Sequence, residues 1–344
     1  MESEINAQSA VNAQRRIGPT TLSVVVGIAL FLSVCGNSIS AGATVPVRLT
    51  WFAPESHFPP VPPGDFLRLF QDDAAWEHAS RHIDVFELST QFFVAAPDAI
   101  VEQVVRVLDK RHIALGLAAE FSCGAHGALP AYAHAAVDKI KKAGGTLGYI
   151  ALDEPLWWVH FAPSAMGCHL ALKETKERTA SIVNVYTAAF PGVIIGEVEP
   201  FPILSDQVNW RNVYIDWLRG LEEQIHRPVT FLHIDFDWRS PGLTSGNPET
   251  ADKEAIGALA RKISNFAHDQ SLSVGMIYNG KATAGSDMEW LSQAGEHMRI
   301  LDSFGLRPDQ AVFQSWHPFP KHSLPDDEPG TFTNFIIQHS EQKR

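Results

Sequence analysis

Eight short apolar runs, rich in β-branched and aromatic side chains, recur along the chain after residue 44. Such runs are typical of strands that are buried on both faces, as in a parallel sheet. The runs are Val45–Phe52, Ile83–Leu88, Ile113–Ala119, Leu147–Leu152, Val193–Val198, Val229–Ile234, Leu272–Tyr278 and Ala311–Trp316.

Between these runs lie longer stretches with one apolar and one polar face, which predict amphipathic helices. A proline followed by an acid marks two helix starts, at Ala96-Pro97-Asp98 and Asn247-Pro248-Glu249, and glycine follows several helix ends. The predicted helices are Pro97–Lys110, Pro130–Lys142, Leu170–Ala189, Val208–Glu223, Pro248–His268 and Asp287–Phe304, with a last helix from about Thr331.

Strands that alternate with helices predict the α/β class, either as a closed barrel or as an open doubly wound sheet. Acids, aromatics and histidines follow most of the runs, rather than clustering at one switch point. No glycine-rich nucleotide-binding turn follows any run. We therefore predict a single (β/α)8 TIM barrel that spans residues 44–344.

Residues 1–43 have the pattern of a signal peptide or membrane-targeting segment. Arg15-Arg16 precedes the apolar run Leu22–Val34, and the small residues Ala41-Gly42-Ala43 follow as a cleavage site requires. This order predicts export to the periplasm or the medium. The alternative is that the uncleaved segment anchors the protein in a membrane.

Charge narrows the range of partners. The formal net charge is -12 and no long basic run is present, which argues against nucleic acid or an anionic membrane surface. A neutral or weakly acidic carbohydrate fits this charge. We expect a monomer with no stable membrane partner once the signal is removed.

Cys123 and Cys168 follow two neighbouring predicted strands, and Cys35 belongs to the targeting segment. Export would permit a disulfide between Cys123 and Cys168, and two free thiols are the alternative. No cysteine and histidine pattern of a metal site is present.

Asp153-Glu154-Pro155 ends the fourth predicted strand and resembles the Asn-Glu-Pro motif of clan A glycoside hydrolases. The resemblance implies a barrel in which Glu154 is the general acid/base, with Asp153 in place of asparagine. The nucleophile glutamate of that clan has no counterpart, because the seventh strand ends in Tyr278-Asn279-Gly280. This absence favours an inverting or other mechanism over double displacement.

Glu199 is predicted as the second catalytic carboxylate. It precedes Pro200 just as Glu154 precedes Pro155, and it follows the neighbouring predicted strand. Glu197 shares its side-chain parity, is predicted to lie deeper and is the alternative for this second carboxylate. Asp153 is a further candidate for a catalytic acid.

The sixth predicted strand ends in Asp235 and Asp237, which share a face by the two-residue period. Asp235 could raise the pKa of Glu154 and keep it protonated near neutral pH, or serve as a catalytic acid itself. Glu87 and Glu120 end the second and third strands, where we expect them to bind substrate.

Large aromatic and polar side chains at strand ends are predicted to hold the sugar, since aromatic faces stack on its apolar side. These predicted substrate-binding residues are Trp51, Trp157, Trp238, Tyr278, Asn279, Trp316 and His317, with Asp237 and the two strand-end glutamates.

The pattern favours an exported glycoside hydrolase that cleaves a polysaccharide or oligosaccharide without a cofactor or metal. One alternative is a metal-dependent sugar isomerase or lyase, in which Glu87, Glu120, Asp235 and His233 would ligate Mg²⁺ or Mn²⁺. Another is a carbohydrate-binding barrel without catalysis.

Overall fold

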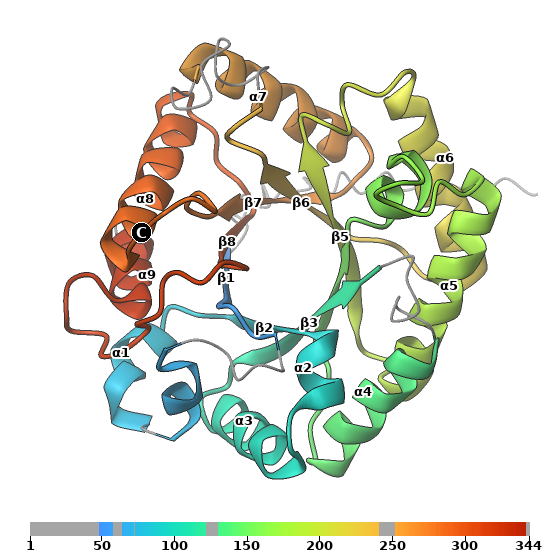
Figure 1. Cartoon of the computed structure of the whole chain (residues 1–344). Helices are drawn as coiled ribbons and strands as arrows, with labels where there is room; N and C mark the ends of the chain where they lie inside the picture. The colour runs from blue at the N-terminus through green and yellow to red at the C-terminus, as the bar shows by residue number, and fades with distance from the viewer. Residues whose placement is uncertain (1–47, 58–63, 72, 122–129, 241–251, 342–344) are drawn as a thin grey trace, which may run out of the picture. The chain divides into compact units, whose positions relative to one another are not determined.

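The structure is a computed structural model that describes residues 48–57, 64–71, 73–121, 130–240 and 252–341. Eight parallel strands close into a barrel in the order of the chain, and helices surround it (Figure 1). The strands are β1 (Leu49–Ala53), β2 (Val85–Ser89), β3 (Ala114–Glu120), β4 (Tyr149–Asp153), β5 (Ile194–Phe201), β6 (Phe231–Phe236), β7 (Ser273–Tyr278) and β8 (Gln310–Gln314).

The predicted TIM barrel is confirmed, and each predicted strand overlaps an observed one. The long helices are α3 (Asp98–Lys110), α4 (Pro130–Lys142), α5 (Leu172–Ala189), α6 (Trp210–Ile225), α7 (Lys253–Asp269), α8 (Asp287–Ser303) and α9 (Phe332–Glu341). Five short elements were not predicted: the 3-10 turns η1 (Phe66–Phe70) and η2 (Asp73–Trp76), the helices α1 (Glu77–Ser80) and α2 (Thr90–Ala95), and the π-helix η3 (Leu156–Phe161).

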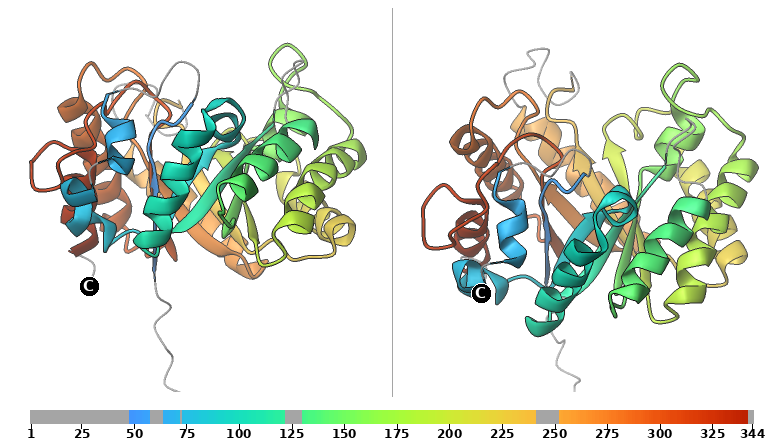
Figure 2. Two further views of the ribbon diagram at one scale, coloured as in Figure 1. Left: turned by 90° about the horizontal axis from the view of Figure 1, so that it is seen from below. Right: turned by 60° about the horizontal axis from the view of Figure 1, so that its bottom comes forward.

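The barrel closes where β1 pairs with β8, in a register that runs from Leu49↔Gln310 to Ala53↔Gln314. Side views show the helices outside the strands, as right-handed crossovers between parallel strands require (Figure 2). This arrangement brings all eight carboxyl ends of the strands to one mouth of the barrel.

The inside of the barrel is a packed core. Trp51 fills its centre, with ring centroids 5.1 Å from Tyr149, 5.4 Å from Phe231 and 4.7 Å from His233. Around these large rings the strands carry small residues, such as Gly196 beside Phe231. Because large and small residues alternate, these side chains fill the space around Trp51 inside the barrel.

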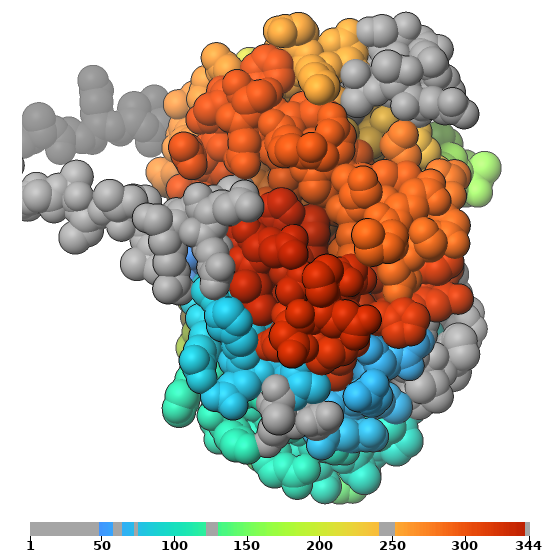
Figure 3. All heavy atoms as spheres, turned by 90° about the vertical axis from the view of Figure 1, so that its left-hand side faces the viewer, coloured from blue at the N-terminus to red at the C-terminus, as the bar shows by residue number. Residues whose placement is uncertain are grey.

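The C-terminal segment covers the part of the barrel wall near β1 and β8. On one face it lies between α8 in orange and the blue segment that contains η1 and α1 (Figure 3). The Asp65 carboxylate accepts the backbone N–H groups of Ser323 at 2.7 Å and Leu324 at 2.9 Å. Asp326 in turn accepts the N–H of Ala79 at 2.8 Å. These contacts join residues far apart in the sequence.

The predicted targeting segment, residues 1–43, lies outside the described residues. Within the part of the chain that the structure describes, none of the helices is both long and apolar enough to cross a membrane.

We predict that Gly275→Ala destabilises the barrel. A Cβ atom on Gly275 would lie 2.2 Å from Cδ2 of the buried His233 ring, so the interior must shift. Overpacking of this kind typically lowers the free energy of unfolding by about 1–3 kcal/mol. Denaturant unfolding measures the change, with Gly192→Ala as a control because nothing lies within 4 Å of its added methyl. Equal stability of the two variants would contradict this account of the core.

Candidate active site

A cavity of about 290 Å³ opens at the carboxyl-terminal mouth of the barrel. Its lining is dominated by side chains from the strand ends and from the segments that follow β1, β4 and β8. The carboxyl groups in this lining belong to Glu87, Glu120, Asp153, Glu154 and Asp235. The site therefore gathers five acids in a single cavity.

The two-residue period of the strands explains why three of these acids, Glu87, Asp153 and Asp235, face the cavity. Val85 on β2 and Ala151 on β4 belong to the core inside the barrel. Two residues further along the same strands, Glu87 and Asp153 point the same way. By the same alternation, Phe231 on β6 is followed by Asp235 four residues later.

The same period corrects the predicted role of Glu197 and Glu199. Val198 lies inside the barrel and lines the cavity, so its two neighbours point outward to the helical layer. Glu197 accepts hydrogen bonds from the Tyr214 hydroxyl and, at 2.8 Å, from the Trp217 indole N–H, both on α6. Neither glutamate lines the cavity, so the structure removes both from the set of catalytic candidates.

Glu199 instead anchors the backbone at the start of η3. Its carboxylate accepts the backbone N–H groups of Leu156 at 2.8 Å and Trp157 at 3.2 Å, at the start of η3. The first N–H groups of a helix have no partner within the helix, and a buried carboxylate satisfies them well. Burial and the nearby Glu197 and Glu154 carboxyls raise the pKa of Glu199, against the effect of these amides.

Glu154 sits between β4 and η3 with a left-handed backbone, at φ 53°. A glutamate rarely adopts this conformation, and such strain concentrates at functional sites. Its N–H donates to the Val198 carbonyl at 3.0 Å, and its carbonyl accepts from the Trp158 N–H at 2.9 Å. This geometry turns the side chain into the cavity, where it was predicted to lie.

The surroundings of the Glu154 carboxyl favour its protonated form. Burial raises its pKa well above the ordinary value, and the neighbouring Asp153 and Asp235 carboxyls raise it further. A hydrogen bond from the Trp158 side chain acts in the opposite direction. A protonated carboxylic acid can donate its proton to a bound ligand.

Three other carboxyls of the cavity also have raised pKa values. Burial, Glu120 and Asp235 raise the pKa of Asp153 to about 7. Burial also raises the pKa of Asp235 to about 7, although the Asn279 side-chain amide donates to it at 3.2 Å. Burial, and then the nearby Asp153 carboxyl, raises the pKa of Glu87 to about 8. At neutral pH this cavity therefore contains both protonated and ionised carboxyls.

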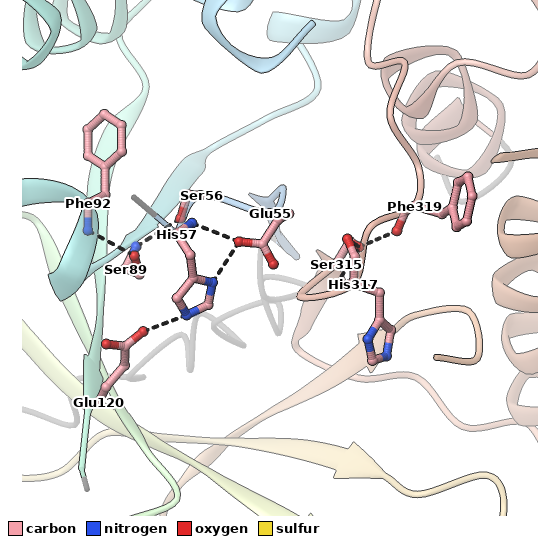
Figure 4. Close-up of polar contacts among 9 residues, drawn as sticks. All are labelled: Glu55, Ser56, His57, Ser89, Phe92, Glu120, Ser315, His317 and Phe319. Atoms are coloured by element: carbon pink, nitrogen blue, oxygen red, sulfur yellow. Dashed lines mark hydrogen bonds and ion pairs between the residues drawn. The ribbon is translucent and has the colours of Figure 1, made fainter. Parts of the chain in front are cut away.

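A histidine that sequence reasoning missed, His57, completes the rim of the cavity (Figure 4). Its Nε2 lies 3.0 Å from Glu120 and its Nδ1 lies 2.6 Å from Glu55. The hydrogen bonds to Glu120 and Glu55 raise its pKa to about 10, so the ring is a cation at neutral pH. The available signal was Glu55-Ser56-His57 in the loop directly after the first strand.

Hydrogen bonds fix the loop that carries His57 to the next strand (Figure 4). The Ser56 hydroxyl accepts the N–H of Ser89 at 3.1 Å, at the end of β2. The Ser89 hydroxyl in turn accepts the N–H of Phe92 and caps α2. Both serines line the cavity and were not predicted.

Trp316 lies at the mouth as predicted for a stacking platform, with 49% of its surface exposed, and it lines the cavity together with Trp158. The other predicted aromatic platforms are corrected because they are buried away from the cavity. Trp51 lies in the barrel core, Trp157 and Tyr278 are buried, and Trp238 stacks on His297 at 3.7 Å.

Four polar residues predicted near the mouth occupy supporting positions. Asn279 is buried and contacts Asp235, and His317 is buried with its ring 3.7 Å from that of Trp316. Asp237 pairs with Arg239 at 3.1 Å outside the cavity, which corrects its predicted substrate contact. His233 lies deep in the core and contacts Gln310 at 2.9 Å.

Among the residues that the structure describes, no group of three or more acids, histidines or cysteines has the arrangement of a metal site. Cys168 is disulfide-bonded. The predicted partner, Cys123, and the remaining cysteine, Cys35, lie outside the described residues.

No family model matches the sequence, and no curated protein matches it. Solved structures with a similar course of the chain include a fungal β-1,4-galactanase, at 8% identity and TM-score 0.48, over 84% of this chain and 99% of that one. The carboxyl transferase domain of Rhizobium etli pyruvate carboxylase matches at 11% identity and TM-score 0.47, over 86% of this chain and 46% of that one. Orotidine 5′-monophosphate decarboxylase of Methanocaldococcus jannaschii matches at 10% identity and TM-score 0.39, over 86% of this chain and 97% of that one.

We predict that Glu199→Ala destabilises the protein because it leaves the Leu156 and Trp157 amides without an acceptor. A buried polar group left unsatisfied costs about 1–3 kcal/mol of unfolding free energy. Glu199→Gln keeps an acceptor oxygen and is the matched control, with a smaller loss expected. Denaturant unfolding compares the two, and near-ultraviolet circular dichroism reports the adjacent tryptophans. An alanine variant as stable as wild type would contradict the anchoring role.

Proposed function

We propose that this protein is a glycoside hydrolase that cleaves a polysaccharide or oligosaccharide in the cavity at the mouth of its barrel. The observation that carries the proposal is the pairing of the buried Glu154 carboxyl, whose pKa is raised by burial and by its acidic neighbours, with Asp235 inside one cavity. Hydrolysis of a glycosidic bond needs a carboxylic acid and a carboxylate in the same site.

Glu154 is the general acid in this proposal. It gives its proton to the glycosidic oxygen as the bond to the leaving sugar breaks. Asp153 and Asp235 make loss of the proton to water unfavourable, because a second negative charge would form beside them. The Trp158 side chain orients the carboxyl through its hydrogen bond.

Asp235 is the carboxylate partner, and the Asn279 amide fixes its orientation. Strand β5 lies between β4, which ends just before Glu154, and β6, which carries Asp235. In an inverting mechanism, which we propose here, the carboxylate activates a water molecule on the face opposite the leaving group, and the two carboxyl groups lie about 6.5–9.5 Å apart. Inversion also agrees with the absence of an acid at the end of β7.

Sugar binding would use the indoles at the mouth. Trp316 and Trp158 offer apolar surface to the sugar rings, and the exposed Trp316 lies at the entrance. Gln314 and Ser315 add hydrogen-bonding groups beside them. This combination of stacking faces and convergent polar groups is typical of carbohydrate sites.

We also propose that the protein works outside the cytoplasm, as the pattern of residues 1–43 predicts. The disulfide at Cys168 supports this, because disulfides persist mainly in oxidising compartments. A polymeric substrate outside the cell fits the same location.

We predict that Glu154→Gln lowers kcat by about 100-fold or more and leaves substrate binding nearly unchanged, because it keeps the shape but removes the proton donor. The assay is release of reducing ends from a panel of polysaccharides, followed by steady-state kinetics on the best substrate. Glu254→Gln is the control, since Glu254 is an exposed acid in the first turn of α7 and does not line the cavity. An unchanged rate in Glu154→Gln would reject the assigned role.

The pH dependence of kcat/KM should be bell-shaped. Activity rises as Asp235 ionises through a pKa of about 7 and falls at higher pH, where Glu154 loses its raised-pKa proton. Rates measured in constant-ionic-strength buffers test this order. Full activity that persists at a pH far below 7 would show that Asp235 is not the required carboxylate.

A further inference from the structure

Glu87 stands apart from the other acids because half of its carboxyl group has no partner. The residue lines the cavity with only 3% of its surface exposed. One oxygen, Oε1, receives a long contact from the Gln314 amide at 3.5 Å. The other, Oε2, is buried and makes no hydrogen bond. A buried carboxyl oxygen without a donor is costly unless a ligand supplies one.

The neighbouring strands pack closely on one side of this carboxyl. Glu87 pairs with Gly116 on β3, where Val85 and Trp51 fill the space beside the glycine. On the other side, Ala53 follows the last pair between β1 and β2, Phe52↔Phe86, and adds only a methyl group. Both Ala53 and Glu87 line the cavity. The Ala53 side of the carboxyl is therefore the side from which a small donor group would approach the buried Oε2.

The charge of the lining favours a cationic group over an anionic one. Of the described residues that line the cavity, His57 is the sole basic side chain, and Glu55 and Glu120 already hold its two ring nitrogens. Asp153, Glu154 and Asp235 add further carboxyls. An acidic sugar would meet these acids without a free cation to balance it.

We propose that the cavity recognises an amino sugar with a free amino group, whose ammonium donates to Oε2 of Glu87. The ligand would replace the missing donor with a charge-assisted hydrogen bond, which is stronger than a neutral one. This inference rests on the proposed function of the same cavity, since it names the class of sugar that the glycosidase would accept.

Binding of an ammonium group should release protons. Glu87, with a pKa of about 8, carries a proton much of the time at neutral pH. A bound cation favours the ionised form and lowers that pKa. The bound cation also lowers the pKa values of Asp153 and Asp235, which line the same cavity. An uncharged sugar produces no comparable release.

Isothermal titration calorimetry on the exported, disulfide-bonded protein tests the proposal. The ligands are glucosamine and galactosamine oligosaccharides, each compared with its N-acetylated counterpart of equal length. We expect the free-amine form of at least one pair to bind about tenfold or more tightly, as a charged hydrogen bond implies. Titrations in two buffers of different ionisation enthalpy should show proton release for that form alone.

Two variants test whether Glu87 is the residue that gives the preference for the free amine. Glu87→Gln should remove most of the preference for the free amine while N-acetylated ligands bind as before. Glu254→Gln removes one negative charge from the exposed surface of α7 and should leave the preference intact. If Glu87→Gln does not fold, Glu87→Asp takes its place, because the shorter side chain withdraws the carboxyl from the amine and should weaken the preference.

Equal or weaker binding of every free-amine ligand, or binding without proton release, would overturn the proposal. A preference that survives in Glu87→Gln would overturn the assignment to Glu87. The proposed hydrolase function fails separately, if no saccharide is cleaved or if Glu154→Gln retains full activity. Hydrolysis of an uncharged glycan with no affinity for amines would retain that function and reject this inference alone.

Discussion

The alternation of side chains along eight parallel strands is the constraint on which the site depends. Once Trp51, Phe231 and His233 fill the inside of the barrel, every second residue beyond them must point into the mouth. Glu87 and Asp235 enter the cavity for this reason. The apolar layers inside the barrel therefore form the floor of the cavity, and the acids lie in the next layer above them.

Acids crowded on such a floor repel one another, and the structure balances this in two ways. Some of the carboxyls favour their protonated form, since burial raises the pKa values of Asp153 and Asp235 to about 7, with a further contribution from neighbouring cavity acids at Asp153 and from Asp237 at Asp235. At the rim, His57 contributes a positive charge that two carboxylates hold in place. Because neighbouring carboxyls titrate as coupled groups, a charged ligand in the cavity changes the pKa values of several of them at once.

Much of the fold could be predicted from the sequence, because buried parallel strands leave continuous apolar runs and their helices leave amphipathic ones. The cavity positions of Glu154 and Asp235 followed from their place after those runs. Glu199 was assigned wrongly because the pattern Glu-Pro does not reveal which face of β5 is inside, and Gly196 and Val198 occupy that face. His57 was missed because its partners, Glu55 and Glu120, meet only when β1 and β3 are brought to the same mouth.

The wrongly assigned glutamate nevertheless serves the site. By holding the Leu156 and Trp157 amides, Glu199 starts η3 immediately after Glu154. The strained backbone of Glu154 then has a fixed segment on each side, β4 before it and η3 after it. Strain at one residue persists only when its surroundings determine the conformation more strongly than the residue's own preference. The buried carboxyl group of Glu199, outside the barrel, thus keeps Glu154 in position inside the cavity. The roles of these two glutamates could be distinguished only once the direction of each side chain was known.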